Sequence, residues 1–392
     1  MINDKLLKLN HDTNNFFGTI IVIIAFVINP FLSLLISIYF SFTQKSDYFN
    51  FILIINVSLF LGLLNSTKLL DSDLINYHLI FTKVPQYSFS DFLQNENKDY
   101  LFFAYTYIFY FLSGGSWEIY LTISTAISYY LILKSNFIIA KTYNSSNYLI
   151  TYLIIIIGFL YPLFIHSAHL FRNFLAASFV FYFLINYYVL NKRKFWLILV
   201  AFLTHASSWV FAIILILPNK HLNEKFKTRF IVLLFSLILF NYFNLDFIFQ
   251  SNQALRIAEE VASESVFNID RYSYFVVILF LMLFTYEKTK TIKHKYNINL
   301  YSLVVLFIIV IAVLFLYVGG SVIYHRYLLY SVMLSTIYLS IFIIAKKRKI
   351  APIIAALLTI LNLVAFSQNY QYGAWKYADF TSIISNFLFS YF

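Results

Sequence analysis

The sequence of 392 residues contains no cysteine, which excludes disulfide bridges, thiolate metal sites and cysteine nucleophiles. Charged residues make up only 11% of the chain, which also holds only 8 glycines and 5 prolines. So few charges and turn-forming residues leave little material for a soluble domain or for a flexible linker rich in proline, glycine and serine. The organisation of the chain must therefore be sought in its apolar segments.

Apolar residues dominate, since 61% of the chain is hydrophobic and 21% is aromatic. Apolar runs of roughly 20 residues recur from one end to the other, and each is long enough to cross a hydrocarbon core of ~30 Å as a helix. We therefore predict an all-α, polytopic integral membrane protein with about 10–12 transmembrane helices in a single domain, 1–392. Full spans are expected at 16–42, 50–66, 117–134, 148–165, 170–190, 228–250, 272–286, 299–318, 324–345 and 349–366. The N-terminal segment is typical of a first span and not of a cleaved signal peptide.

Basic residues concentrate between the apolar segments, at 191–194, 219–229, 287–295 and 346–349. The formal net charge is +11, but no long basic run with interleaved aromatics lies outside the apolar segments, so no nucleic-acid partner is expected. By the positive-inside rule these loops are cytoplasmic. Residues 67–99 and 251–271, and the turns at 166–172 and 319–326, then fall on the extracytoplasmic side.

Two apolar segments do not fit simple crossings of the membrane. With basic loops inside at both of its ends, 195–217 is predicted to be a re-entrant pair broken at Thr204–Ser208. The short, tyrosine-rich segment 100–113 ends at Gly114-Gly115 and is predicted to be an outer re-entrant or interfacial helix. One or two re-entrant or broken segments are therefore part of the predicted fold.

Several polar residues interrupt these apolar segments on the predicted outer side. Arg172 begins the span 170–190, and His166 and His169 precede it by six and three residues. An arginine within a membrane segment is costly, so an anion site competes here with a side chain that reaches the headgroups. His205 falls at the predicted break, where a cavity-facing imidazole and a purely structural histidine are alternatives. HxxH at 166–169 lacks a third ligand fixed by spacing, so no metal is expected.

Two further groups of polar residues lie on the same predicted side. Arg326 opens the span 324–345 beside Tyr324 and His325, where anchoring at the membrane interface is the alternative to a binding role. Asp73 and Tyr77 lie in the segment LLDSDLINYH. An aspartate there could act in acid–base catalysis, and a solvated loop without a catalytic role is the alternative. Arginines and histidines gathered on one side of a membrane domain suit a phosphate or diphosphate bound next to lipid.

Two segments of the chain resemble motifs of the EpsG-like branch of the Wzy-type polysaccharide polymerases. LLDSDLINYH resembles the outer-loop signature of that family through Asp73, Asn76 and Tyr77. FRNFLAASFVFYFLINYYVLNKRKFWLILVAFLTHASS resembles its central block, which places Arg172 and His205 at its most telling positions, with Asn173 in place of the usual glutamine. The family's Glu-Pro pair before the short helix is absent, because the segment reads ENKDYLF, and no role is carried over to Glu96 or Asp99.

The resemblance implies a bacterial enzyme of the cytoplasmic (inner) membrane that joins lipid-linked oligosaccharide repeat units at its extracytoplasmic face. It implies that the growing glycan is transferred from undecaprenyl diphosphate to an incoming repeat unit, as in O-antigen, capsule or exopolysaccharide synthesis. It implies no nucleotide sugar, and no cofactor is expected. A chain-length regulator and a flippase are the protein partners such an enzyme would have.

On this interpretation the polar residues take distinct roles. Arg172 and Arg326 would bind the diphosphate, and His205, His169 or Asp73 would be the catalytic base, a histidine being favoured because its unperturbed pKa is ~6.5. Contacts with the glycan would involve Tyr77, His166, Tyr324 and His325. Two other functions remain as alternatives: a transporter or flippase of the same lipid-linked oligosaccharide, and a membrane O-acyltransferase that modifies surface glycans.

Overall fold

The structure is a computed structural model that describes residues 2–44, 46–70, 72–94, 99–143, 145–205, 207–208, 321–345 and 388–391, with isolated positions between 353 and 360. Within these residues the chain is helical and contains no strand. The all-α prediction is therefore confirmed for the described part of the chain. The spans predicted at 228–250, 272–286 and 299–318, most of the span at 349–366, the loop 251–271 and the second limb of the re-entrant pair lie outside the described residues.

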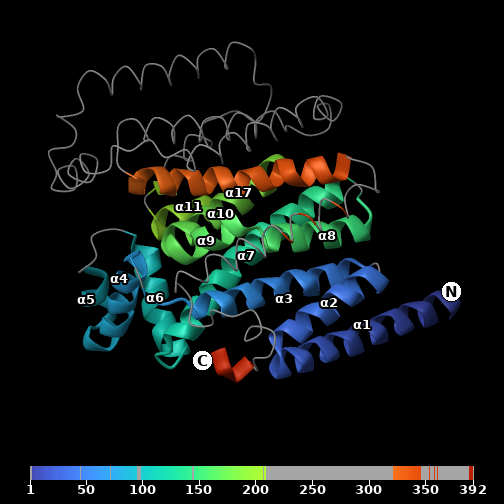
Figure 1. Ribbon diagram of the computed structural model, residues 1–392, viewed down its shortest axis with the longest axis horizontal. Helices are drawn as coiled ribbons and strands as arrows, with labels where there is room; N and C mark the ends of the chain where they lie inside the picture. Colours follow the sequence, from blue (N-terminus) through green and yellow to red (C-terminus); the bar gives the residue numbers. More distant parts are fainter. Residues whose placement is uncertain are drawn as a thin grey trace, which may run out of the picture.

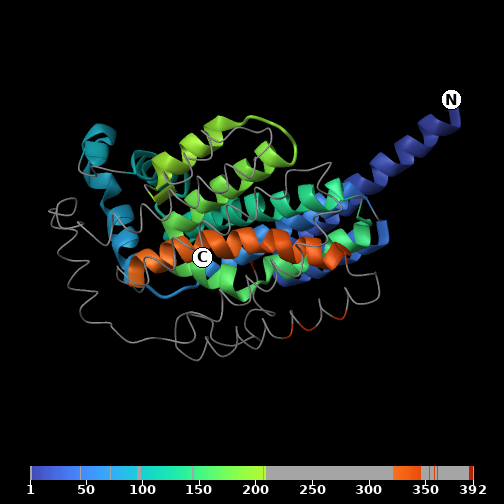
Figure 2. The same ribbon diagram turned by 90° about the horizontal axis from the view of Figure 1, so that it is seen from above.

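The longer helices run roughly side by side, as Figures 1 and 2 show, and α4, α5 and α6 stand at an angle to them. In chain order they are α1 (Ile2–Ile28), α2 (Pro30–Gln44), α3 (Asp47–Ser66), α4 (Ser72–Lys83), η1 (Val84–Gln86), α5 (Phe89–Gln94), α6 (Tyr100–Leu112), α7 (Trp117–Thr142), α8 (Asn147–Gly158), α9 (Tyr161–His169), α10 (Phe171–Tyr188), α11 (Phe195–Thr204), α17 (Ser321–Ala345) and η3 (Leu388–Tyr391). The N-terminal end of α1 projects away from the other helices, and α4, α5 and α6 gather at the opposite end of the molecule.

Two predicted spans are wrong because each is divided into two helices. The segment 16–42 breaks at Asn29, where α1 ends and α2 begins. Pro30 has no N–H to donate and sits at the first position of α2, while the Asn29 side chain accepts a hydrogen bond from the Leu32 N–H at 2.9 Å and so caps the new helix. The Ser33 hydroxyl donates to the Val22 carbonyl at 2.8 Å, so α2 packs back against α1. The segment 148–165 likewise divides into α8 and α9 before Pro162.

The other predicted spans in the described part correspond to helices. The spans 50–66, 117–134, 170–190 and 324–345 match α3, α7, α10 and α17, of which α7 continues eight residues beyond the predicted end. Among the residues described, α3 and α7 are long and apolar enough to cross a membrane, and several shorter helices are also apolar. The short helix predicted at 100–113 is α6, and α11 ends at Thr204 as the predicted break requires.

Close packing of α3 against α7 and α8 forms the core. A side chain at Gly62 of α3 would place its Cβ 2.3 Å from the Thr122 carbonyl oxygen of α7, and one at Gly158 of α8 would meet Val57 Cγ1 at 2.6 Å. Leu53, Ile54 and Val57 of α3 are fully buried in this core. Glycine therefore lets the backbones approach where a larger residue would separate the helices.

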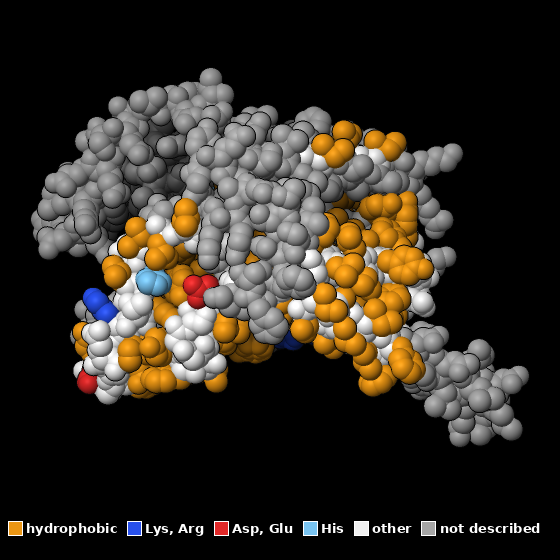
Figure 3. All heavy atoms as spheres, turned by 60° about the horizontal axis from the view of Figure 1, so that its bottom comes forward, with side chains coloured by type: hydrophobic (Ala, Val, Ile, Leu, Met, Phe, Trp, Pro, Cys, Tyr) orange, Lys and Arg blue, Asp and Glu red, His pale blue; other side chains and the backbone are white. Residues whose placement is uncertain are grey.

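Much of the described surface is apolar instead of charged, as Figure 3 shows. Phe16 and Phe17 of α1 are 62% and 59% exposed, and Trp196 and Leu199 of α11 are 58% and 56% exposed. Large hydrophobic side chains therefore face outward on several of the described helices, a pattern typical of surfaces that contact lipid or another protein. Inside, the Asn136 amide of α7 donates to the Thr336 hydroxyl at 3.1 Å and accepts from the Ser340 hydroxyl at 2.9 Å, which joins α7 to α17.

The segment 67–99, predicted to be an extracytoplasmic loop, contains α4, η1 and α5. Its helices pack through aromatic contacts against α6 and α7, with Phe81 and Phe92 buried. They cover the end of the bundle where α3, α6 and α9 have termini and α10 begins. That end holds the residues singled out in the sequence.

Candidate functional site at one end of the bundle

Helix termini bring the candidate residues together. His166 and His169 lie in the last turn of α9, Arg172 lies in the first turn of α10, and His205 directly follows α11. Because α9 and α10 are separated by Leu170 alone, the two histidines and the arginine stay at one end of the bundle. Tyr77 lies on α4, which packs beside α6 and α9.

Arg172 forms a buried ion pair with Asp99, the residue that immediately precedes α6. The Arg172 Nη1 atom lies 2.9 Å from the Asp99 Oδ2 atom, and the two side chains are only 13% and 2% exposed. Removing one partner of such a pair leaves an uncompensated buried charge, which typically costs several kcal/mol. The pair therefore fixes the start of α10 against the start of α6.

The backbone at Asp99 departs from the usual geometry of a helix start. Asp99 has φ 58° and ψ 38°, in the left-handed region that a non-glycine residue enters at a cost. An aspartate at this position normally accepts a hydrogen bond from a free N–H of the first turn, yet its side chain makes no such cap. The carboxylate is turned to Arg172 instead, so the ion pair overrides the local preference of the chain.

Aromatic rings surround the Arg172 guanidinium. Its Cζ atom lies 5.4 Å from the ring centre of Tyr77, 5.6 Å from that of Phe102 and 6.0 Å from that of Phe103. Rings at this distance attract the cation and keep water away from it. The Nε atom of Arg172 is buried without a hydrogen-bond partner, so the guanidinium has donor capacity that the ion pair does not use.

The next residue, Asn173, joins α10 to the break after α11 and to α17. The Asn173 Oδ1 atom accepts hydrogen bonds from the Ser207 hydroxyl at 2.8 Å and the Tyr330 hydroxyl at 3.3 Å. The Tyr330 hydroxyl also lies 2.8 Å from the Ser208 hydroxyl. Two adjacent residues of α10 thus make different contacts: Arg172 pairs with Asp99, and Asn173 binds the residues that follow α11.

The break itself is built around His205. His205 has φ −155° and ψ 126°, an extended conformation that ends α11, and only 6% of the residue is exposed. Its Nδ1 atom accepts a hydrogen bond from the Ser207 N–H at 3.0 Å. A neutral imidazole that accepts at Nδ1 carries its proton on Nε2, so His205 presents an N–H donor at its far nitrogen.

His169 also accepts at Nδ1, from Lys68, a residue that was not among the predicted site residues. The Lys68 Nζ atom, at the end of α3, lies 3.2 Å from the His169 Nδ1 atom, and only 5% of Lys68 is exposed. An ammonium group can only donate, so a charged Lys68 leaves the His169 proton on Nε2. Lys68 also adds a second buried cation to this end of the bundle.

His166 has the opposite arrangement. Its Nδ1 atom lies 2.5 Å from the Pro162 carbonyl oxygen, which can only accept, so Nδ1 carries the proton. In neutral His166 the lone pair therefore lies on Nε2. Of the three histidines, His166 alone has the protonation pattern of a base at its outer nitrogen.

Four predicted site residues fall where the structure describes the backbone alone. Asp73 lies in the first turn of α4, and Tyr324, His325 and Arg326 lie in the first two turns of α17. Their proposed roles stay predictions. Among the residues described, no three histidine, cysteine, aspartate or glutamate side chains gather as a metal site would require.

The sequence predicts that Arg172, Tyr77 and the three histidines lie at one end, but it does not predict their partners Asp99, Lys68 and Tyr330. No role was assigned to Asp99, because the Glu-Pro pair of the family is absent from its segment. Its position directly before the tyrosine-rich helix is the feature of the sequence that points to it. Lys68 carried a weaker signal, a lysine at the end of an apolar span. Tyr330 carried none, because it is one of many tyrosines in the chain.

Comparison with known proteins identifies the family. The model of the EpsG family matches residues 51–378, which include every candidate residue named above. No curated protein and no solved structure matches the chain. Together with the apolar helices, this match indicates a membrane protein. Because the match covers most of the sequence, the chain belongs to the EpsG family.

Proposed function

We propose that this protein is a polysaccharide polymerase that joins lipid-linked oligosaccharide repeat units at the extracytoplasmic face of the bacterial cytoplasmic membrane. Membership of the EpsG family supports a polymerase-like role. The observation that carries the proposal is Arg172, a guanidinium buried among three aromatic rings at the end of an apolar bundle. A planar cation at such a place suits the phosphate oxygens of a lipid carrier.

In the proposed reaction a hydroxyl oxygen of the incoming repeat unit attacks the anomeric carbon of the growing glycan. The bond between that carbon and the oxygen of undecaprenyl diphosphate breaks, and the diphosphate leaves with the bonding electrons. Arg172 and Arg326 bind this diphosphate and stabilise the negative charge that develops on it. No nucleotide sugar, metal or other cofactor takes part in the proposed step.

The proton of the attacking hydroxyl needs a base. His205 and His169 accept at Nδ1 and so present Nε2–H, which suits a hydrogen bond to a phosphate oxygen better than proton removal. His166 donates at Nδ1 to Pro162 and so has a basic Nε2 atom. We therefore assign the base to His166, and Asp73 is the alternative.

The aromatic residues at this end give the sugar a surface to contact. Tyr77 already packs against Arg172, and Tyr324 and His325 lie near the start of α17. Aromatic rings stack on the apolar faces of sugars, so these residues suit the part of the substrate next to the diphosphate. A flippase that delivers the repeat units and a regulator of chain length are the partners this function requires.

The proposal is tested by deleting the gene in its host and restoring it with variants at matched abundance, followed by a gel of the surface glycan. We expect the wild type to restore the ladder of polymer lengths and Arg172→Ala to leave single repeat units. Arg193→Ala, which removes an exposed arginine of the basic turn after α10, is the matched control and should restore the ladder. A full ladder in the deletion strain would contradict the proposal and favour a transporter or a modifying enzyme.

A further inference from the structure

We propose that the Asp99 carboxylate occupies the anion position of Arg172 until a diphosphate of the lipid-linked substrate takes its place. The inference rests on the proposed function, because it names the ligand of Arg172 as a prenyl diphosphate. It adds a residue to which the sequence assigned no role. Asp99 is a positioning residue in this account, since it acts through Arg172 and not on the reacting atoms.

The first support is that the ion pair between Arg172 and Asp99 is almost completely buried. The Asp99 carboxylate is 2% exposed and lies 2.9 Å from the Arg172 Nη1 atom. Without a counter-ion, a guanidinium among Tyr77, Phe102 and Phe103 would be a buried charge without compensation. Asp99 therefore allows the apolar end of the bundle to hold an arginine ready before any substrate is present.

The second support is that the closed pair leaves both partners in unfavourable arrangements. Asp99 adopts a left-handed backbone at φ 58° and forgoes capping α6. Arg172 keeps its Nε–H buried without a partner. A diphosphate has more acceptor oxygens than a carboxylate and more negative charge, so it can satisfy more of the Arg172 donors and release Asp99 to relax.

The third support is the set of hydrogen-bond donors near Arg172. Lys68 lies at the same end of the bundle, hydrogen-bonded to His169 three residues before Arg172. The Nε2–H groups of His169 and His205 are further donors of the kind that phosphate oxygens accept. Each of these groups can donate to a phosphate oxygen, and a diphosphate has more acceptor oxygens than a carboxylate.

The exchange is tested by binding of geranyl diphosphate, a short prenyl diphosphate, to the purified full-length protein in lipid nanodiscs. Asp99→Asn keeps the shape of the side chain but removes the competing charge, so we expect about fivefold tighter binding or more, the lower end of typical coupling between two sites. Asp91→Asn is the matched control: Asp91 is an exposed residue of α5 that accepts from the Ser88 hydroxyl at 2.6 Å, and its variant should bind like the wild type. Geraniol lacks the diphosphate, so neither variant should bind it more tightly than the wild type does.

Equal or weaker binding of geranyl diphosphate by a folded Asp99→Asn protein would overturn the inference, as would the absence of binding by every variant. The proposed function is judged separately by the glycan ladder of Arg172→Ala. If Arg172→Ala loses the ladder while Asp99→Asn binds geranyl diphosphate like the wild type, the proposed function stands and the role of Asp99 does not.

A second measurement uses the wild type alone, in case Asp99→Asn does not fold. The backbone N–H groups of Phe102 and Phe103 donate to the Asp99 carbonyl at 2.9 Å and 3.3 Å. If the diphosphate releases Asp99, its left-handed backbone relaxes and the hydrogen exchange of these two amides changes. A changed rate of hydrogen exchange at Phe102 and Phe103 with geranyl diphosphate, and not with geraniol, supports the displacement of Asp99; an unchanged rate contradicts it.

Discussion

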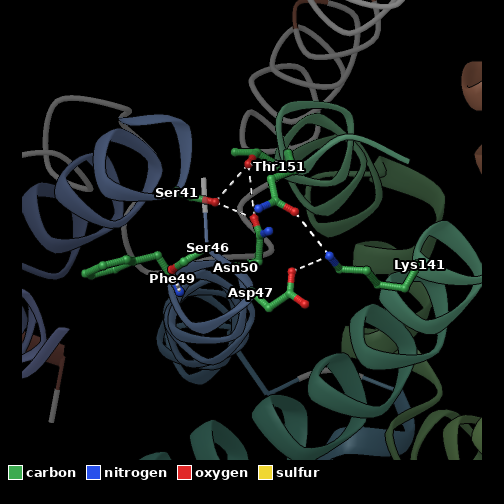
Figure 4. A network of polar contacts seen from close by, with 8 residues as sticks. Ser41, Ser46, Asp47, Phe49, Asn50, Lys141 and Thr151 are labelled. Carbon is green, nitrogen blue, oxygen red and sulfur yellow. Dashed lines mark hydrogen bonds and ion pairs between the residues drawn. The ribbon is translucent and has the colours of Figure 1, made fainter. Parts of the chain in front are cut away.

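The two ends of the helical bundle both contain a lysine or arginine paired with an aspartate, but the pairs differ in their surroundings. At the end where α2 and α7 finish and α3 and α8 begin, Lys141 contacts Asp47 and donates to the Asn147 side chain at 3.2 Å (Figure 4). The Lys141 and Asp47 side chains are 34% and 58% exposed, whereas those of Arg172 and Asp99 are 13% and 2% exposed. Water therefore screens the first pair and not the second.

The polar groups beside the two ion pairs also differ. Beside the Lys141 pair, the Asn50 Oδ1 atom accepts from the Ser41 hydroxyl at 2.5 Å and from the Thr151 hydroxyl at 3.1 Å, which joins α2, α3 and α8 (Figure 4). These hydrogen bonds hold helix ends together, while the Asn50 Nδ2 atom is buried without a partner. Beside the Arg172 pair lie a buried lysine and three histidines, groups that can carry positive charge. The first end has the features of a structural junction, and the second is where we propose the binding site.

The largest expected effect separates the histidines of the second end. His166→Gln removes the proposed base, so turnover should fall about 100-fold or more, the usual contribution of a general base. His205→Gln keeps an N–H donor near the position of Nε2 and should retain much more activity. The measurement is the rate of polymer formation with each variant across pH, and the rise in rate with pH should disappear in His166→Gln alone. Greater loss in His205→Gln would reverse the assignment.

A smaller effect is expected from the network that connects Asn173 to the break after α11. Tyr330→Phe removes the hydroxyl that lies 2.8 Å from the Ser208 hydroxyl and donates to Asn173. Loss of one such buried group should lower the free energy of unfolding by about 1–3 kcal/mol. Thermal unfolding in detergent measures the change, with Tyr39→Phe, an exposed tyrosine of α2, as the control. An unchanged melting temperature would show that the network does not stabilise the break.

The smallest effect is expected at the first end. Lys141→Ala removes an exposed pair, so the free energy of unfolding should change by less than about 1 kcal/mol, and polymer formation should match that of the wild type. Thermal unfolding and the glycan ladder measure the two quantities. A lost ladder in this variant would remove the distinction between the two ends.

Much of this arrangement could be predicted because hydropathy records which segments are apolar helices. The break at 204–208 and the short helix before Gly114 followed from charge and length. The sequence analysis does not predict the breaks before Pro30 and Pro162, because the hydropathy stays high across both and does not report where one helix ends and the next begins. In each case the proline was the visible sign of the break.

The site was predicted in part for a similar reason. Arg172, His166, His169 and His205 are conspicuous in apolar sequence because each is costly there. Their partners are not conspicuous, since Asp99 lies in a polar segment and Lys68 lies at the end of a span. Only the packing of α3, α6 and α9 around the start of α10 brings these residues together, and no local pattern in the sequence reports that packing.

The most direct test of the central claim, that Arg172 binds the diphosphate of a lipid-linked glycan, is polymer formation by purified protein given lipid-linked repeat units. Arg172→Lys keeps the charge but loses the planar pair of donors that bind phosphate oxygens. Arg193→Lys makes the same change at an exposed position and is the control. The account predicts a polymer from the wild type and from Arg193→Lys, and little or none from Arg172→Lys; polymer of full length from Arg172→Lys would contradict it.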